Sequence, residues 1–309
     1  MIRRLSVTLA VVALTSTIAS GCSTFSKNGE AAKVDGTALS IDDFEALNNG
    51  LAKAGVIEPA TNGEYSSNAM RSTLTRWVLA TSLRLDLAKQ GVTIDDAAKA
   101  SAKSVLQANT AVQFDALDST TQDFLIDELA GQSTLVASPL ITDAEAEAAY
   151  TAGLTESNTL CLRVIGFPDS DKANTAYQQL LDGADFAGLA DANNTDGSIG
   201  KGGVFTDATT KSECVSAASL NAQVGQALAK TDLGVPAAPQ AFTGSDGTTQ
   251  QFFIFMQRPW AEVADAATPL VRQALGPAAR KKLLADARAT VDSRYGMWDA
   301  ATLTVLPTR

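Results

Sequence analysis

Apolar residues recur every three or four positions through most of residues 32–152, which is the spacing of amphipathic helices. In the segment 67–90, for example, Leu74, Trp77 and Val78 fall on one helical face. The pattern predicts helices over residues 41–51, 67–90, 93–107, 120–135 and 142–152. Residues 32–40 precede them as two short strands around Asp35-Gly36, a pair that favours the tight turn of a hairpin. This part of the chain is therefore expected to be mainly helical and fronted by one hairpin.

The pattern changes to alternation at residues 159–167, which predicts a strand. The apolar run 252–256 predicts a second, buried strand. Between the two strands, helical spacing predicts helices over residues 171–181, 185–192 and 219–229. A strand, helices and a returning strand together predict a compact α/β module.

Helical spacing returns beyond Pro259-Trp260, where it predicts one helix over residues 267–291. The chain then closes on a short predicted strand at 303–306. A mainly helical part combined with an α/β module gives an α+β fold class.

The N-terminus has the three parts of a secretory signal: Arg3 and Arg4, an apolar run over residues 5–18, and small residues before Cys22. The run is too short for a stable bilayer span, which needs roughly 20 residues, so a cleaved signal peptide at 1–21 is the better prediction. The small-small-Cys ending resembles the bacterial lipobox, although Ala19 stands where Leu is commonest. The resemblance implies that Cys22 carries a lipid anchor and that residues 22–31 form a polar tether. The alternative is an ordinary secretory signal with a stray cysteine.

The charge balance is acidic: the chain has 24 Lys and Arg against 34 Asp and Glu, and a formal net charge of −10. Loss of Arg3 and Arg4 with the signal peptide would make the charge more negative still. No basic stripe is present in the sequence. This argues against nucleic acid as a partner, because nucleic-acid binding needs a basic footprint.

The sequence has no histidine. This excludes Ser-His-Asp and Cys-His catalysis and any zinc site that uses histidine, and no residue pattern predicts a metal or a cofactor. Cys161 and Cys214 are the thiols that remain once Cys22 is lipidated. In an oxidising compartment the two favour a disulfide, the alternative being two separately buried thiols.

Three neighbouring motifs resemble the centre of parvulin-type peptidyl-prolyl isomerase domains. They are the stretch Asp182-Gly-Ala-Asp-Phe-Ala-Gly-Leu-Ala190, the loop Asn194-Thr-Asp-Gly-Ser198, and Lys201-Gly-Gly203. The helix expected at 221–230, with Asp232-Leu-Gly-Val-Pro236 after it, is similar to a later segment of that family.

Upstream, the Val34-Asp35-Gly36 hairpin and the helix start Ile41-Asp42-Asp43-Phe44 resemble the beginning of the SurA and PrsA chaperone domain. The resemblance implies a helical chaperone domain over residues 32–155 and an inserted parvulin-like domain over 156–260. It also implies that residues 261–309 return as a helix and strand to complete the chaperone domain.

Parvulins twist the X-Pro bond without a cofactor, using two strand histidines and a loop Cys or Asp above an apolar proline pocket. By the resemblance, Leu162 stands at the first histidine position and Phe252 or Phe253 at the second. Asp196 corresponds to the loop acid, although a purely turn-forming role in Asp-Gly is an equal alternative. Enzymatic activity is therefore left open.

The same register gives candidate peptide-binding residues: Val204, Phe205, Leu220, Phe252 and Phe253. The alternative for the aromatic run is a buried core strand, and alternate residues of a strand must face opposite sides of the sheet.

The resemblance implies an extracytoplasmic chaperone, anchored to the membrane through lipidated Cys22, that binds extended segments of unfolded or newly exported proteins. The parvulin domain would then be inactive or weak. An active isomerase acting on X-Pro bonds is the alternative. A solute-binding or envelope-structural lipoprotein is a third hypothesis, which predicts two α/β lobes rather than a helical first half.

Overall fold

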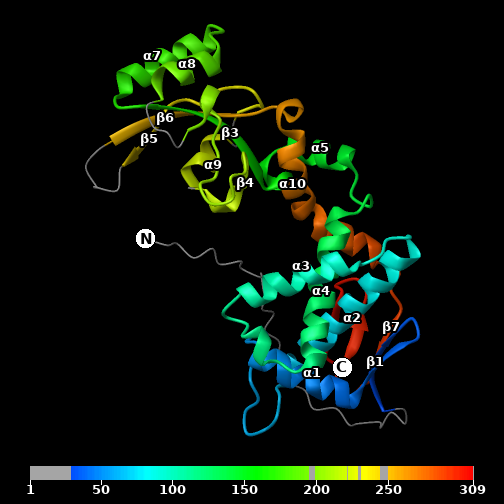
Figure 1. Cartoon of the computed structure of the whole chain (residues 1–309). Helices are drawn as coiled ribbons and strands as arrows, with labels where there is room; N and C mark the ends of the chain where they lie inside the picture. The colour runs from blue at the N-terminus through cyan, green and yellow to red at the C-terminus, as the bar shows by residue number, and fades with distance from the viewer. Residues whose placement is uncertain (1–28, 195–198, 221, 229–230, 244–249, 309) are drawn as a thin grey trace.

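The computed structural model describes residues 29–194, 199–220, 222–228, 231–243 and 250–308 (Figure 1). Its α+β fold has two bodies. Helices α1 to α4 and both ends of the described chain form a helical body, and a four-stranded sheet with its covering helices forms a sheet body. The long helix α10, orange in Figure 1, runs from the sheet body towards the helical body.

The helices of the helical body each begin at a side chain that accepts a hydrogen bond from the backbone three residues later. The N-cap residues are Ser40, Ser66, Asp95 and Asp118. Such N-caps satisfy one of the free N–H groups of a first helical turn. The elements are α1 (Ile41–Lys53), α2 (Ser67–Lys89), α3 (Asp96–Ala108), the 3-10 turn η1 (Phe114–Ala116) and α4 (Ser119–Ala137).

The two ends of the chain meet in the helical body. Strand β1 (Glu30–Val34) lies between β2 (Thr37–Ser40) and β7 (Ala289–Val291), and both pairings are antiparallel. The hairpin of β8 (Met297–Asp299) and β9 (Thr304–Leu306) packs on α2. There the N–H of Val305 donates to the Thr75 hydroxyl at 2.9 Å. The core joins residues from both ends of the sequence, for example Phe44 and Tyr295, whose ring centroids lie 4.9 Å apart.

The helix predicted at 267–291 is wrong at both ends. Helix α10 spans Trp260–Leu283 and begins directly after Pro259, whose extended backbone forms the cap. Residues 289–291 form β7 instead of a last helical turn, because they pair with β1. This long-range pairing supplies their backbone hydrogen bonds, and local helical spacing gives no sign of it.

The sheet body is built on two long strands, one predicted from the alternation at 159–167 and the other from the apolar run at 252–256. The strand order is β4-β3-β6-β5, and all the pairings are antiparallel. The strands are β3 (Thr159–Phe167), β4 (Cys214–Ser216), β5 (Gln240–Thr243) and β6 (Gln250–Gln257). The remaining elements are α5 (Asp143–Ala152), α6 (Leu154–Ser157), α7 (Ser170–Leu181), α8 (Phe186–Asn193), the 3-10 turns η2 (Lys201–Gly203) and η3 (Ala217–Ser219), and α9 (Ala222–Leu228).

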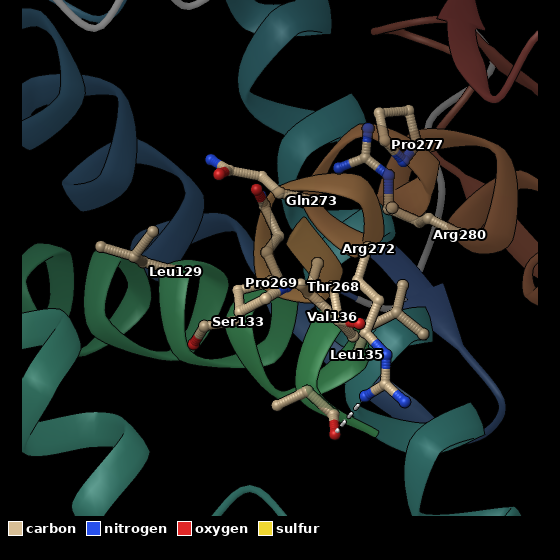
Figure 2. Close-up of a pocket in the computed structure, with 13 residues that line it drawn as sticks. Leu129, Ser133, Leu135, Val136, Thr268, Pro269, Arg272, Gln273, Pro277 and Arg280 are labelled. Carbon is tan, nitrogen blue, oxygen red and sulfur yellow. Dashed lines mark hydrogen bonds between the residues drawn. The ribbon is translucent and has the colours of Figure 1, made fainter. Parts of the chain in front are cut away.

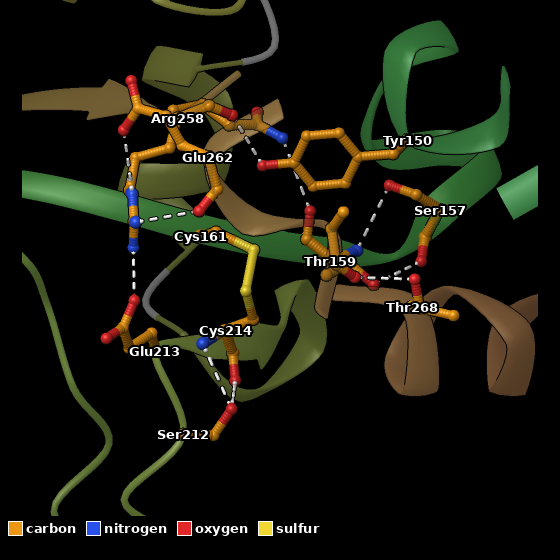
Figure 3. Close-up of a disulfide and its surroundings, with 12 residues drawn as sticks. Tyr150, Ser157, Thr159, Cys161, Ser212, Glu213, Cys214, Arg258, Glu262 and Thr268 are labelled. Atoms are coloured by element: carbon orange, nitrogen blue, oxygen red, sulfur yellow. Dashed lines mark hydrogen bonds and ion pairs between the residues drawn. A yellow bond between two sulfur atoms is a disulfide. The ribbon is translucent and has the colours of Figure 1, made fainter. Parts of the chain in front are cut away.

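Cys161 and Cys214 face each other across β3 and β4, and their sulfur atoms lie 2.02 Å apart, as in a disulfide (Figure 3). Both residues are buried. A bridge between residues 53 positions apart stabilises a fold by about 4 kcal/mol in the chain-entropy model.

The disulfide lies at the junction where α5 and α10 meet the sheet body. Here the Tyr150 hydroxyl donates to the carbonyl of Arg258 at 2.9 Å, and the rings of Tyr150 and Trp260 lie 5.4 Å apart. The Arg258 guanidinium forms ion pairs with Glu213 at 2.6 Å and Glu262 at 3.4 Å (Figure 3). These contacts tie the start of α10 to the strands.

No helix within the described ranges is long and apolar enough to cross a membrane.

Candidate functional site

Two of the predicted functional residues, Asp196 and Cys22, lie outside the described residues. The strand positions predicted, by the resemblance, to correspond to the parvulin histidines are described. Leu162 is buried in β3, and Phe252 and Phe253 lie on β6 opposite Phe167 and Gly166 of β3. Hydrocarbon side chains therefore occupy all three positions, and none of them can donate or accept a proton.

Three of the five candidate peptide-binding residues share one face of the sheet. Phe205, Leu220 and Phe253 are partly buried and pack against one apolar cluster, which includes Leu160, Leu162, Val164 and Phe255. Phe252 lies on the opposite face with residues of α7 and α8, as the alternation of a strand requires. Val204 pairs with Arg163 through an isolated bridge and is not part of this cluster.

The sequence analysis missed Phe242, on strand β5. Its ring lies 5.6 Å from that of Phe253 and 5.9 Å from that of Phe255, in edge-to-face contacts. A hairpin signal was available, since Gly244 and Asp246-Gly247 separate Phe242 from the apolar run on β6. One residue of this aromatic face thus comes from β5, a strand of four residues that is too short to be recognised by alternation alone.

The Lys201-Gly202-Gly203 motif has a structural explanation. Gly202 and Gly203 have φ angles of +67° and +76°, which favour glycine. A Cβ atom on Gly203 would lie 2.8 Å from both the Val164 carbonyl oxygen and the Ala190 Cβ atom. The Arg163 guanidinium donates to the Gly202 carbonyl at 2.8 Å. The motif therefore packs the loop onto β3 and α8.

A separate open groove lies between α4 and α10 (Figure 2), with a volume of about 590 Å³. Its walls are mostly apolar, and the two helices approach closely where Gly276 meets Val136: an added Cβ would lie 3.1 Å from Val136 Cγ2. The lining residues are Leu129, Gln132, Ser133, Leu135, Val136, Ala137, Thr268, Pro269, Arg272, Gln273, Gly276, Pro277 and Arg280.

Two prolines of α10 line the groove. Proline has no backbone N–H, so Pro269 and Pro277 leave the carbonyls four residues earlier, at Asp265 and Gln273, without their usual helical donor. The Gln273 carbonyl belongs to a residue of the groove itself. The groove wall therefore includes a residue whose carbonyl lacks its usual i+4 helical donor.

Comparison with solved structures finds PrsA foldases and a SurA-like chaperone. PrsA of Streptococcus pneumoniae matches with a TM-score of 0.34 and 15% identity over 84% of this chain and 92% of that chain. PrsA of Lactococcus lactis matches with a TM-score of 0.38 and 13% identity over 89% and 99%. A SurA-like chaperone of Campylobacter jejuni matches with a TM-score of 0.28 and 10% identity over 85% and 99%.

These neighbours are of the kind that the sequence motifs resemble. The TM-scores are all below 0.5, so no residue of this chain takes a role from them. No protein-family model and no curated protein matches the chain.

Two ionisable groups at the junction, Tyr150 and Glu262, have shifted pKa values. Burial raises the pKa of the Tyr150 hydroxyl to about 12, although the hydrogen bond with Gln257 acts in the opposite direction. Burial also acts to raise the pKa of Glu262, but the guanidinium groups of Arg163 and Arg258 outweigh it and hold that pKa below its ordinary value. These shifts follow from packing and ion pairing between α10 and the strands.

Proposed function

We propose that this protein is an extracytoplasmic chaperone or foldase that binds extended segments of unfolded or newly exported proteins. The observation that carries the proposal is the open, mostly apolar groove between α4 and α10. Apolar walls favour the hydrophobic side chains that an unfolded protein exposes. An open groove accepts a continuous chain, whereas binding of a small solute usually needs a site that encloses it.

The proposal includes a domain assignment and a membrane anchor. Residues 32–155 and 261–309 would form the chaperone domain, with residues 156–260 inserted as the parvulin-like domain. The pairing of β1 with β7 supports this assignment, because it brings the first and last segments into one sheet. Cleavage after residue 21 would leave lipidated Cys22 to hold the protein at the cell membrane, with 22–31 as its tether.

The parvulin-like domain is proposed to bind peptide with weak or no catalysis. The partly buried aromatic face of Phe205, Phe242 and Phe253 supports binding. The apolar residues at the histidine positions speak against proton transfer or hydrogen bonding to a twisted amide. An active X-Pro isomerase that relies on Asp196 is the second candidate, because parvulin-like motifs surround that residue.

Replacement of Ser133 by Trp tests the groove. Ser133 is exposed on α4 and lines the groove, so the indole would fill it. We expect Ser133→Trp, in a form lacking residues 1–22, to suppress the aggregation of a chemically denatured test protein several-fold less well than the unmodified form. Light scattering measures this effect.

Ser104→Trp is the matched control. Ser104 is also an exposed helical serine whose hydroxyl bonds to a carbonyl of its own helix, but it lies on α3, outside the groove. Equal suppression by both variants would contradict a role for the groove. The same samples should be assayed for isomerisation of an X-Pro peptide, with Asp196→Ala as the control. Acceleration that is lost in Asp196→Ala would establish the second candidate.

A further inference from the structure

The charges along the groove between α4 and α10 are all of one sign. Of the residues that line it, only Arg272 and Arg280 ionise, and both are cationic. The chain as a whole carries a net charge of −10. A cationic, largely apolar groove in an acidic protein is complementary to an anionic ligand that also has apolar groups.

The two arginines have unused hydrogen-bond donors. One terminal nitrogen of Arg272 donates to Asp143 at 2.8 Å and the other to the Ala137 carbonyl at 3.3 Å. The Nε of Arg272, however, is buried without a partner. Arg280 is partly buried, and its guanidinium has no hydrogen bond or ion pair with any residue that the structure describes.

A carboxylate satisfies such donors best. A guanidinium presents parallel N–H groups that match the two oxygens of a carboxylate, and these charge-assisted bonds are stronger than neutral ones. Leu129, Val136 and Pro269 offer apolar contact in the same groove. A segment with Lys or Arg at this place would instead meet the like charge of Arg280, which no carboxylate of the described residues pairs, whereas Arg272 is paired with Asp143.

We infer that the groove between α4 and α10 selects extended segments in which a carboxylate lies beside apolar side chains, and that Arg280 is the main residue that binds the carboxylate. This inference rests on the proposed chaperone function and names the substrate class of its groove. The carboxylate is that of an internal Asp or Glu, because the groove is open and accepts a continuous chain.

The test measures binding of labelled peptides by fluorescence anisotropy, with the full chain in nanodiscs of zwitterionic lipid. One leucine-rich peptide carries a central Glu, and two others carry Gln or Lys at that position. A further pair has no internal acid and ends in a free carboxylate or an amide. We expect the Glu peptide to bind about five- to tenfold more tightly than the Gln peptide. The preference for the Glu peptide should shrink at 1 M salt. The peptides with a free C-terminal carboxylate or an amide show whether the carboxylate of a chain end binds as tightly as that of an internal Glu.

The variant Arg280→Gln should reduce the Glu-over-Gln preference to about twofold or less, and this ratio of two affinities measured on the same variant is the readout. Arg280→Lys keeps the charge but loses the paired donors, so it should retain part of the preference. Lys281→Gln is the matched control: it removes one positive charge at the next residue, which does not line this groove, and should keep the full preference.

Three results would overturn the inference: equal binding of the Glu and Gln peptides, tighter binding of the Lys peptide, or a Glu preference that survives Arg280→Gln in protein with an unchanged circular dichroism spectrum. Absence of peptide binding together with intact suppression of aggregation would also overturn it, while the proposed function would stand. Absence of both peptide binding and suppression of aggregation in the unmodified protein would contradict the proposed function itself.

Discussion

At the scale of single residues, the backbone of Gly203 fixes where the loop before Val204 can lie. Its φ angle is +76°, and its Cα faces the Val164 carbonyl and the Ala190 side chain closely. Any side chain there must strain the backbone and also displace β3 or α8. The glycine is therefore needed for packing, whether or not the sheet body binds proline.

We expect Gly203→Ala to lower the free energy of unfolding by about 1–3 kcal/mol, because it adds backbone strain to a steric clash. Urea denaturation measures the change. Gly225→Ala is the control, since Gly225 lies inside α9 with nothing within 4 Å of an added Cβ. That change should be neutral or stabilise by up to about 1 kcal/mol. Equal effects of the two variants would contradict the packing argument.

Tyr150 provides a test of the junction through pH. It is fully buried, and its pKa of about 12 lies above the ordinary value of 10. Between pH 10 and 12 the unfolded state has lost the tyrosine proton while the folded state still holds it. Stability present below pH 10 is therefore lost as the pH rises, at about 1.4 kcal/mol per pH unit from this group.

The variant Tyr150→Phe should show a flatter fall of stability between pH 10 and 12 than the unmodified protein. At neutral pH it should be less stable by about 1 kcal/mol, because it lacks the hydrogen bond to the Arg258 carbonyl. Denaturation at several pH values measures both effects. Parallel curves for the two proteins above pH 10 would mean that Tyr150 ionises as freely in the folded state as in the unfolded state.

At the scale of elements, the sequence predicts what local burial dictates. Helix α2 buries one regular helical face, so its spacing reveals it, and strand β3 is revealed as a long apolar segment that is buried on both faces. Strands β4 and β7 have three residues each, too few for a pattern, and they exist because distant partners supply their hydrogen bonds. The sequence predicts Phe205 and Phe253 of the aromatic face but not Phe242, because Phe242 comes from the short strand β5.

The groove could not be predicted from the sequence. Its walls come from α4 and α10, which are separated in the chain by the whole sheet body. In the sequence, each of these two helices has the pattern of an ordinary amphipathic helix. Only the placement of Pro269 and Pro277 inside a helix gave a local sign that α10 is unusual.

At the scale of the whole molecule, the two bodies differ in how they use the chain. All four strands of the sheet body come from one continuous stretch, and near its ends the Gln257 side chain reaches the Thr159 carbonyl at 3.5 Å. The helical body needs both chain ends, since β1 pairs with β7 and Val305 packs with Leu74 and Val78.

We expect a fragment of residues 143–271, which keeps the parts of α5 and α10 that pack on the disulfide, to fold by itself and a fragment of residues 29–155 not to fold. The second fragment lacks β7, β9 and α10, and its apolar core would be open to water. Dispersion of amide signals in NMR spectra distinguishes the two outcomes. Addition of a peptide covering residues 260–308 should restore order to the second fragment, and a folded 29–155 fragment would contradict the expectation.

The pairing of β1 with β7 also sets an order in time. A chain made from its N-terminus displays residues 29–155 long before residues 289–291 exist. The sheet body can complete its strands first, and the groove acquires its second wall only when α10 has followed. The protein therefore cannot bind another chain in this groove until its own synthesis is nearly finished, so a truncated product would lack the groove altogether.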